Sequence, residues 1–161
     1  MVEKTILIVG TYDTKNDELE YMAERVTALD GGILTMDISG SMLAQDLKPD
    51  RLEASKNVAM DFISKRINDR VGLVIFAGES FTQCPITTDH NVLINLFQDV
   101  NSGIIEDGTA IGMGLGSSVN RLIDSKAISK VIILLTDGEN NAGNICLLYT
   151  SPSPRDATLS R

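Results

Sequence analysis

The sequence contains no tryptophan, one histidine and two cysteines among its 161 residues, and only 4% of the residues are aromatic. The two cysteines, Cys84 and Cys146, lie far apart and form no Cys-x-x-Cys pair. Zinc sites depend on cysteine and histidine ligands at defined spacings, and the sequence has no such spacing. Both cysteines are therefore expected to be reduced and structural.

Basic residues are also scarce, because 14 Lys and Arg stand against 22 Asp and Glu and give a formal net charge of −8. A groove that binds nucleic acid needs clustered Lys and Arg, so nucleic acid is not an expected partner. An acidic surface is compatible with cation binding, and it also keeps a protein soluble.

Long apolar runs are missing too. No run approaches the roughly 20 residues that a membrane-spanning helix needs. The first residues, Met1 to Lys4, lead into a strand-like run and not into a signal-peptide pattern. As written, the chain is expected to be cytoplasmic and to form one ordinary domain with a real core, since 43% of its residues are hydrophobic.

The sequence does contain short apolar runs that alternate with amphipathic segments. Strands are predicted at 4–10, 33–37, 71–77 and 130–136, with a weaker edge strand at 80–86. Helices are predicted at 17–29, 51–66 and 91–100, and from the loop at 106–109 to about residue 124. This alternation predicts an α/β fold, a Rossmann-like three-layer sandwich with a mainly parallel sheet. The first 37 residues are interpreted as one β-α-β unit.

Three polar segments lie just beyond predicted strands or at the start of a predicted helix. They are Asp37-Ile-Ser39-Gly-Ser41, Asp107-Gly-Thr109 and Thr136-Asp137-Gly138. Open α/β sheets bind ligands at the edge where their parallel strands end, so the three segments are expected to converge. Each segment alone could equally be a turn or a helix cap, and it is their combination that points to a site.

The residue types in these segments suit a hard divalent cation. The hydroxyls of Ser39, Ser41 and Thr109 would supply neutral oxygens, and the carboxylates of Asp37 and Asp137 would supply charge. Mg²⁺ takes about six oxygens and keeps several waters, so this set predicts a site for Mg²⁺, or Mn²⁺. With only two carboxylates, one coordination position stays open, and a carboxylate from a partner protein can fill it.

These segments also carry a resemblance to a known family. Residues 33–143 resemble a von Willebrand factor type A domain of the bacterial membrane-anchored aerotolerance type. The resemblance lies in DISGSMLAQDLKPDRLEASKNVAMDFI, RVGLVIFAGESFTQCPITTDH, IEDGTAIGMGLGSSVNRL and SKVIILLTDGENNAG. It implies a metal-ion-dependent adhesion site that binds a protein and catalyses no reaction. The residues implied as metal ligands are Asp37, Ser39, Ser41, Thr109 and Asp137.

The resemblance has further implications for the arrangement and the surroundings of the domain. The strand that ends at Asp37 is expected to be central, between strands 71–77 and 130–136. Domains of this kind continue beyond the Thr-Asp-Gly loop, so the domain is expected to be truncated at its C-terminal side. Related full-length proteins have flanking membrane helices and reside at the bacterial inner membrane, whereas this chain has no membrane segment.

The two ends of the chain resemble other sequences. The segment KTILIVGTYDTKNDELEYM is similar to the start of the Tm-one-like family of ATP-binding proteins, over about residues 1–36. Residues 1–32 are therefore interpreted as a β-α fragment of that kind, whose strand takes the place beyond strand 130–136. Residues 144–161 are interpreted as a disordered, non-native tail, because Cys146 to Arg161 resembles translated sequencing-adapter sequence.

Two alternative functions follow from these ends. The segment from Gly10 to Lys15 follows a strand and precedes a helix, so it could bind a nucleotide phosphate at the helix N-terminus. It is not a Walker A loop, because it lacks the Gly-x-x-x-x-Gly-Lys pattern. The chain could also be a non-functional chimera of two gene fragments.

Three further features are interpreted as structural. Gly112, Gly114 and Gly116 lie inside a predicted helix and are expected to be close-packing positions and not a dinucleotide fingerprint. His90 is expected at the exposed start of a helix. Ser39 has no paired base, so a serine hydrolase is not expected.

Overall fold

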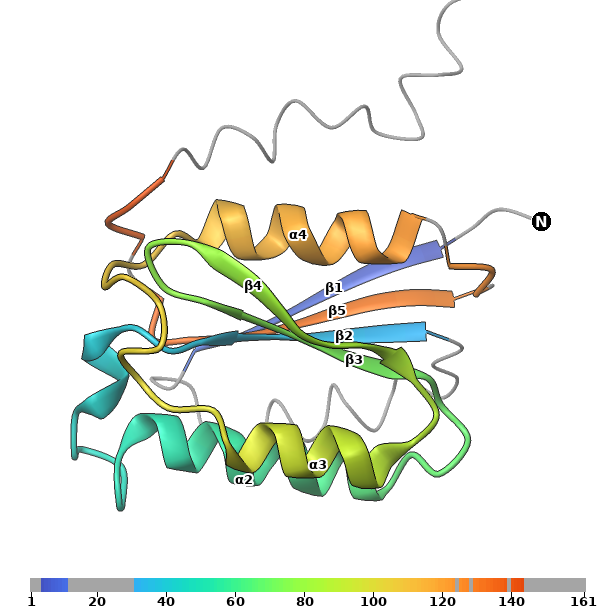
Figure 1. Ribbon diagram of the computed structural model, residues 1–161, viewed down its shortest axis with the longest axis horizontal. Coiled ribbons are helices and arrows are strands. Elements are labelled where there is room, and N and C mark those ends of the chain that lie inside the picture. The colour runs from blue at the N-terminus through green and yellow to red at the C-terminus, as the bar shows by residue number, and fades with distance from the viewer. Residues whose placement is uncertain (1–3, 12–30, 124, 128, 139, 144–161) are drawn as a thin grey trace, which may run out of the picture.

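The fold is a single five-stranded sheet, seen in a computed structural model that describes residues 4–11, 31–123, 125–127, 129–138 and 140–143 (Figure 1). The strands are β1 (Lys4–Thr11), β2 (Gly31–Asp37), β3 (Val71–Phe76), β4 (Ser80–Thr87) and β5 (Ser129–Thr136). Their order is β1-β5-β2-β3-β4. Only β4 is antiparallel to its neighbour, so the predicted mainly parallel sheet is confirmed.

Helices cover both faces of this sheet, which confirms the three-layer sandwich (Figure 1). Helices α2 (Arg51–Ser64) and α3 (His90–Gln98) lie on one face and α4 (Ile111–Ile123) on the other. A short 3-10 helix, η1 (Gly40–Leu43), lies within the loop predicted after β2. Within the described residues, no helix has both the length and the apolar character needed to cross a bilayer.

Side-chain caps fix the starts of the two helices on the first face. Asp50 accepts a hydrogen bond from the backbone N–H of Glu53 at 2.8 Å, and Asp89 accepts one from Val92 at 3.2 Å. These caps satisfy N–H groups that the first turn of a helix leaves without a partner. His90 is the first residue of α3, which confirms the predicted helix start, but it is half-buried and its Nε2 lies 2.8 Å from the carbonyl oxygen of Asp69.

The strand that ends at Asp37 is flanked by β3 and β5, as predicted. Strand β1 pairs with the outer side of β5 in parallel, from Lys4 opposite Ser129 to Thr11 opposite Thr136. The position predicted for the N-terminal strand is thereby confirmed. The two strands of the predicted β-α-β unit, β1 and β2, are not neighbours in the sheet, because β5 lies between them. The predicted helix 17–29, most of the segment from Gly10 to Lys15, and the tail 144–161 fall outside the described residues.

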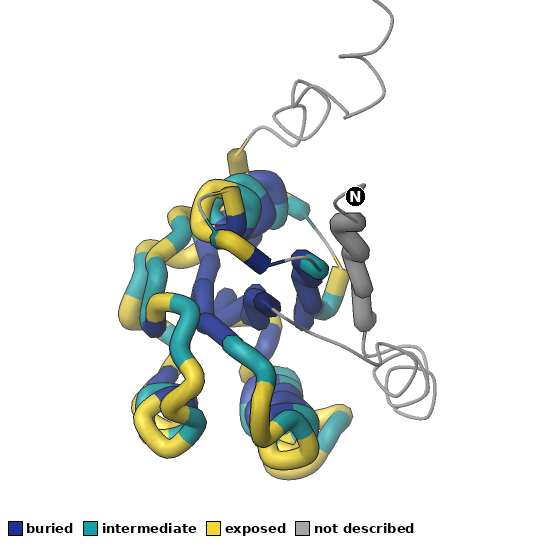
Figure 2. The backbone as a smooth tube through the Cα atoms, turned by 90° about the vertical axis from the view of Figure 1, so that its right-hand side faces the viewer, coloured by how far each residue is buried: buried dark blue, intermediate teal, exposed yellow. Residues whose placement is uncertain are grey.

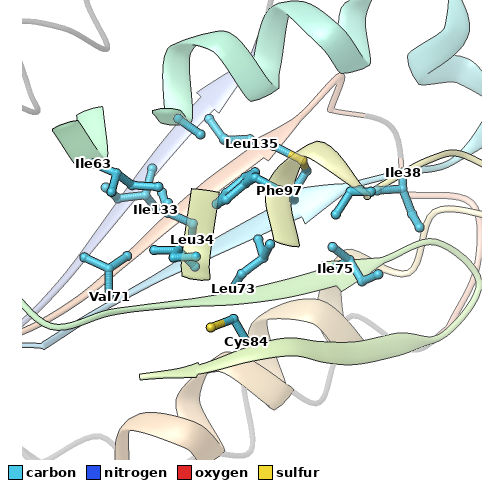
Figure 3. Packing of buried hydrophobic residues seen from close by; sticks show 14 of the residues in the cluster. Leu34, Ile38, Ile63, Val71, Leu73, Ile75, Cys84, Phe97, Ile133 and Leu135 are labelled. Atoms are coloured by element: carbon cyan, nitrogen blue, oxygen red, sulfur yellow. The ribbon is translucent and has the colours of Figure 1, made fainter. Parts of the chain in front are cut away.

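Strands β2, β3 and β5 are buried on both faces of the sheet, which explains why they are almost continuously apolar. Alternate side chains of β2, β3 and β5 pack against α2 and α3, with Phe97 of α3 fully buried among them (Figure 3). Figure 2 shows the inner strands β2, β3 and β5 as the buried centre, with exposed residues on the outer sides of the helices and along the edge strand β4. Cys84 belongs to this cluster, and burial together with the negative charge of Asp89 raises the pKa of its thiol.

The opposite face of the sheet packs against α4. Phe76, Val74 and Ile33 meet Leu115 and Leu122 in a second apolar cluster. At its centre, the hydroxyls of Thr35 and Ser118 are 2.7 Å apart, so two buried polar groups satisfy each other.

Helix α4 approaches the sheet closely at Gly114. A Cβ atom on Gly114 would lie 2.7 Å from Cδ1 of Phe76, whereas a Cβ atom on Gly116 would meet nothing within 4 Å. The close-packing prediction is confirmed for Gly114 and wrong for Gly116.

Candidate metal centre

The three polar segments singled out from the sequence lie at the carboxyl end of the parallel strands, at the left of Figure 1. Hydrogen bonds tie them together in pairs. The Asp107 carboxylate accepts from the backbone N–H of Gly40 at 2.9 Å, which joins the second segment to the first. The Thr136 hydroxyl donates to Oδ2 of Asp37 at 2.7 Å, which joins the third segment to the first. The expected convergence of the segments is therefore seen in the structure.

Asp37 forms the buried floor of this region. Its Oδ1 accepts from the backbone N–H of Ser39 at 2.9 Å, and its Oδ2 accepts from the hydroxyl of Thr136 at 2.7 Å. Burial raises the pKa of the Asp37 carboxyl, and the nearby negative charge of Asp137 adds to the rise, while the bonds from Thr136 and Ser39 oppose it. A dehydrated carboxylate beside a second one is a place where a bound cation would be stabilising.

Ser39 and Ser41 lie side by side in the turn that follows Asp37. Their hydroxyl oxygens are 3.0 Å apart, with Ser39 buried and Ser41 exposed. The intervening turn is anchored by Met42, whose side chain is fully buried in the core. The turn that carries both hydroxyls is therefore fixed to the core at its next residue.

Asp137 follows the end of β5, and its side chain is 7% exposed. Its Oδ2 accepts from Nη1 of Arg51 at 3.1 Å. Its Oδ1 is buried and has no hydrogen-bond partner among the residues that the structure describes. Buried carboxylate oxygens are rarely left without a partner, so this atom marks a position suited to a ligand.

Arg51 connects Asp137 to a second carboxylate, that of Asp46. The guanidinium lies 2.7 Å from Oδ2 of Asp46 through Nη2 and 2.8 Å from Oδ1 through Nε. These bonds hold the pKa of Asp46 below its ordinary value and raise the already high pKa of Arg51. Sequence reasoning missed Arg51 as part of the region, because its place beside Asp137 depends on how α2 lies against the loop that follows β5.

Thr109 is 2% exposed and is held by the loop that follows β5. Its carbonyl oxygen accepts from the backbone N–H groups of Asn141 and Ala142, at 3.1 and 3.2 Å. The Asn140 side chain accepts from the N–H of Ile111 at 2.9 Å, at the first turn of α4. Asn140 thus caps this helix from a different loop, and Asn141 holds the residues just before it. The sequence offered one weak signal for them, their place shortly after the Asp137-Gly138 turn.

Asp107 is a second residue that sequence reasoning assigned no role. Its Oδ1 accepts from both Gly40 and Gly108, each at 2.9 Å, and these bonds hold the pKa of the exposed Asp107 carboxyl below its ordinary value. Gly108 has a φ of +138°, which favours glycine after this aspartate. The Asp-Gly pair in the sequence signals such a turn, but not the bond to Gly40.

We expect Asp107→Ala to loosen the connection between the first two segments. Without the carboxylate, the Gly40 and Gly108 N–H groups lose their acceptor, so their amide hydrogens should exchange with solvent several-fold faster. Hydrogen exchange followed by NMR measures this, with Asp61→Asn on the exposed side of α2 as a control. Unchanged exchange at both glycines would show that Asp107 does not hold the loops.

The donor set of this region fits the cation expected from the sequence. Within the part of the chain that the structure describes, no group of three or more His, Cys, Asp or Glu side chains is placed to hold a metal ion. A site here would rest on two carboxylates, three hydroxyls and water, which is oxygen chemistry suited to Mg²⁺ or Mn²⁺ and not to Zn²⁺.

Comparisons with known proteins agree with this architecture. Residues 33–139 match the family model of the von Willebrand factor type A domain. An uncharacterized protein from Borreliella burgdorferi is 37% identical over 114 residues, which make up 70% of this chain and 33% of that protein. The chain spans about a third of the length of the curated relatives it matches.

Two solved structures share both fold and sequence with the chain. An aerotolerance-related membrane protein from Bacteroides fragilis gives a TM-score of 0.68 at 35% identity, covering 72% of this chain and 57% of that one. BatB from Bacteroides thetaiotaomicron gives a TM-score of 0.67 at 37% identity, with the same coverage. From the matched range, which includes all three polar segments, and from these relatives we conclude that the chain belongs to the von Willebrand factor type A domain family.

Proposed function

We propose that the chain is a protein-binding module in which a divalent cation, Mg²⁺ or Mn²⁺, joins it to a carboxylate of its partner. Membership of the von Willebrand factor type A family supports a role in protein interaction. The residues proposed to hold the cation are Asp37, Ser39, Ser41, Thr109 and Asp137.

The observation that carries this proposal is the pair of carboxylates at the end of the sheet. The Asp37 carboxylate is buried, its pKa is raised, and the charge of Asp137 contributes to that rise. Oδ1 of Asp137 is buried and has no partner among the described residues. Two carboxylates held together in this way repel each other and are poorly hydrated, and a divalent cation between them would reverse both effects.

The same geometry supports a carboxylate as the group that the partner contributes. Mg²⁺ takes about six oxygens, so five protein side chains, some of them acting through water, leave a position for another ligand. Ser41 is exposed, so the region opens to the surface. Asp137 already shares its charge with Arg51, so the two aspartates do not fully neutralise a divalent ion and an anionic partner is attracted.

We expect Thr109→Val to weaken Mg²⁺ binding by about tenfold, a size typical of changes around metal ligands. Valine keeps the shape of threonine but replaces its hydroxyl with a methyl group, so one proposed ligand is lost. Titration calorimetry of the folded protein with Mg²⁺ and Mn²⁺ measures the effect, and the exposed Thr88→Val is the matched control. Equal affinity of Thr109→Val and the parent would remove Thr109 from the site. A folded parent that binds neither ion would refute the proposal.

The surroundings of the module are also part of the proposal. One structural neighbour is described as an aerotolerance-related membrane protein. This description supports the view that full-length relatives are anchored at a bacterial inner membrane, where a domain of this type would meet protein partners.

A further inference from the structure

We propose that Arg51 determines the cation specificity of this site, making it prefer Mg²⁺ to Ca²⁺ by preventing Asp137 from binding through both oxygens. This inference rests on the proposed function, since it concerns the same cation. It assigns a role to a residue that is not itself a metal ligand. It also gives a reason why the site would bind one divalent ion more tightly than another.

Arg51 is held in one orientation by two carboxylates. Its Nε and Nη2 bind the two oxygens of Asp46, at 2.8 and 2.7 Å, and its Nη1 binds Oδ2 of Asp137 at 3.1 Å. A planar guanidinium has its donors in fixed directions, so the bonds to Asp46 orient the one that reaches Asp137. Arg51 is the first residue of α2, and its side chain is only 25% exposed.

This arrangement makes the two oxygens of Asp137 unequal. Oδ2 is committed to the guanidinium, whereas Oδ1 is buried and has no partner among the described residues. Bidentate coordination would place a cation about equally close to both oxygens, and therefore near the positive charge of Arg51. Asp137 is thus restricted to binding a cation through Oδ1, directly or by way of a water.

Asp37 is restricted in a similar manner. Its Oδ1 accepts a hydrogen bond from Ser39 and its Oδ2 accepts one from Thr136, so one of the two lone pairs on each oxygen is already engaged. Neither carboxylate therefore offers both oxygens freely to an ion. Ca²⁺ takes six to eight oxygens and commonly uses bidentate carboxylates, whereas Mg²⁺ takes about six in a near-octahedral arrangement and keeps several waters. Single-oxygen carboxylates and hydroxyls consequently favour Mg²⁺.

The alternative is that the ion pair between Arg51 and Asp137 only holds α2 against the loop after β5. The ratio of the two dissociation constants separates the two roles. Because Mg²⁺ and Ca²⁺ carry the same charge, removing Arg51 changes the electrostatic attraction of both ions in the same direction, and a loss of stability also acts on both. A change in the number of oxygens that Asp137 offers to the cation would mainly change the Ca²⁺ dissociation constant.

The experiment measures Mg²⁺ and Ca²⁺ dissociation constants by titration calorimetry for the parent, Arg51→Gln and Arg51→Met. Both substitutes are good helix formers, and losing a positive charge at the first position of α2 favours the helix dipole, so both variants should fold. Lys65→Gln is the control, since it removes a positive charge from the exposed Lys65–Asp61 pair of the same helix. Infrared difference spectra of the carboxylate stretches report whether Ca²⁺ binds through one oxygen or two.

We expect the parent to bind Mg²⁺ more tightly than Ca²⁺. The ratio of the Ca²⁺ to the Mg²⁺ dissociation constant should fall about tenfold in either Arg51 variant, a size typical of residues that orient metal ligands, and stay unchanged in Lys65→Gln. The Ca²⁺ spectrum of the Arg51 variants should show a bidentate carboxylate that the parent lacks. If the parent binds Mg²⁺ and the folded Arg51 variants have the same ratio of Ca²⁺ to Mg²⁺ dissociation constants as the parent, this inference is overturned and the proposed function is not. A parent that prefers Ca²⁺ would also overturn it. A parent that binds neither ion would overturn the proposed function, and this inference with it.

Discussion

The Asp37→Asn variant is expected to bind Mg²⁺ at least about a hundredfold more weakly than the parent, whose dissociation constant should lie between micromolar and millimolar. One elementary charge acting at about 4 Å through an effective dielectric constant of about 20 contributes roughly 4 kcal/mol, and more when the ion is divalent. Each loss of about 1.4 kcal/mol weakens binding tenfold. The remaining hydroxyls and Asp137 cannot replace that charge.

The same variant is expected to stay folded, which makes the loss of binding interpretable. Asparagine has nearly the shape of aspartate, so its oxygen can accept from the N–H of Ser39 and its amide can donate to the hydroxyl of Thr136. Burial raises the pKa of Asp37, so the ionised carboxylate destabilises the cation-free folded protein at neutral pH. The neutral amide lacks this cost, and the melting temperature without cation should equal or exceed that of the parent.

Titration calorimetry with Mg²⁺ and thermal melting followed by circular dichroism check the two expectations. Asp61→Asn, on the exposed side of α2, removes one carboxylate far from the end of β2 and should change neither quantity. If Asp37→Asn binds Mg²⁺ as tightly as the parent, Asp37 is not a ligand and the cation site lies elsewhere.

Much of the fold could be predicted because a strand that is buried on both faces has a nearly continuous apolar sequence. The run from Val131 to Leu135 is entirely apolar, and such a run of this length fits a strand covered by helices on both sides. The edge position of β4 was predicted from its weaker, more polar pattern, but its antiparallel direction was not. Helix ends shifted by a few residues, since local patterns fix the ends of elements less strongly than their centres.

The supports of the candidate site could not be predicted from local patterns. The proposed ligands follow strand ends, so their sequence positions place them at one edge of the sheet. Arg51 meets Asp137 across 86 residues, and Asn141 meets Thr109 across 32, through the packing of α2 and α4 on the sheet. Nothing in the neighbouring sequence of these residues encodes such a distant partner.

Two of the three glycines of α4 illustrate the same limit at the level of packing. Gly114 and Gly116 lie two residues apart in one helix, so they point about 200° apart around its axis. Only the one that faces the sheet can be a close-packing position, and the sequence pattern alone treats both alike. The structure places Gly114 against Phe76 and leaves open space at Gly116.

We therefore expect the same substitution at these two glycines to change the free energy of unfolding in opposite directions. At Gly116, alanine adds a methyl group in open space and should stabilise the helix by up to about 1 kcal/mol. At Gly114, the new Cβ would lie 2.7 and 2.8 Å from two ring carbons of Phe76, a residue with no exposed surface. Relieving this overlap requires α4 to move from the sheet, and overpacking of this kind typically costs about 1–3 kcal/mol. Because both variants gain the same helix propensity, the difference between them isolates the overlap.

The displacement of α4 in Gly114→Ala should also change the geometry of the candidate metal centre. The backbone N–H of Ala110, one residue after Thr109, donates to the carbonyl of Ala77 at 2.7 Å, just beyond the end of β3. Moving the helix away from β3 strains this bond and shifts Thr109 relative to Asp37. Urea unfolding and Mg²⁺ titration of the two variants test both effects. We expect Gly114→Ala to unfold at lower urea and bind Mg²⁺ more weakly than Gly116→Ala. Equal unfolding midpoints would show that α4 does not lie as close to Phe76 as the structure places it.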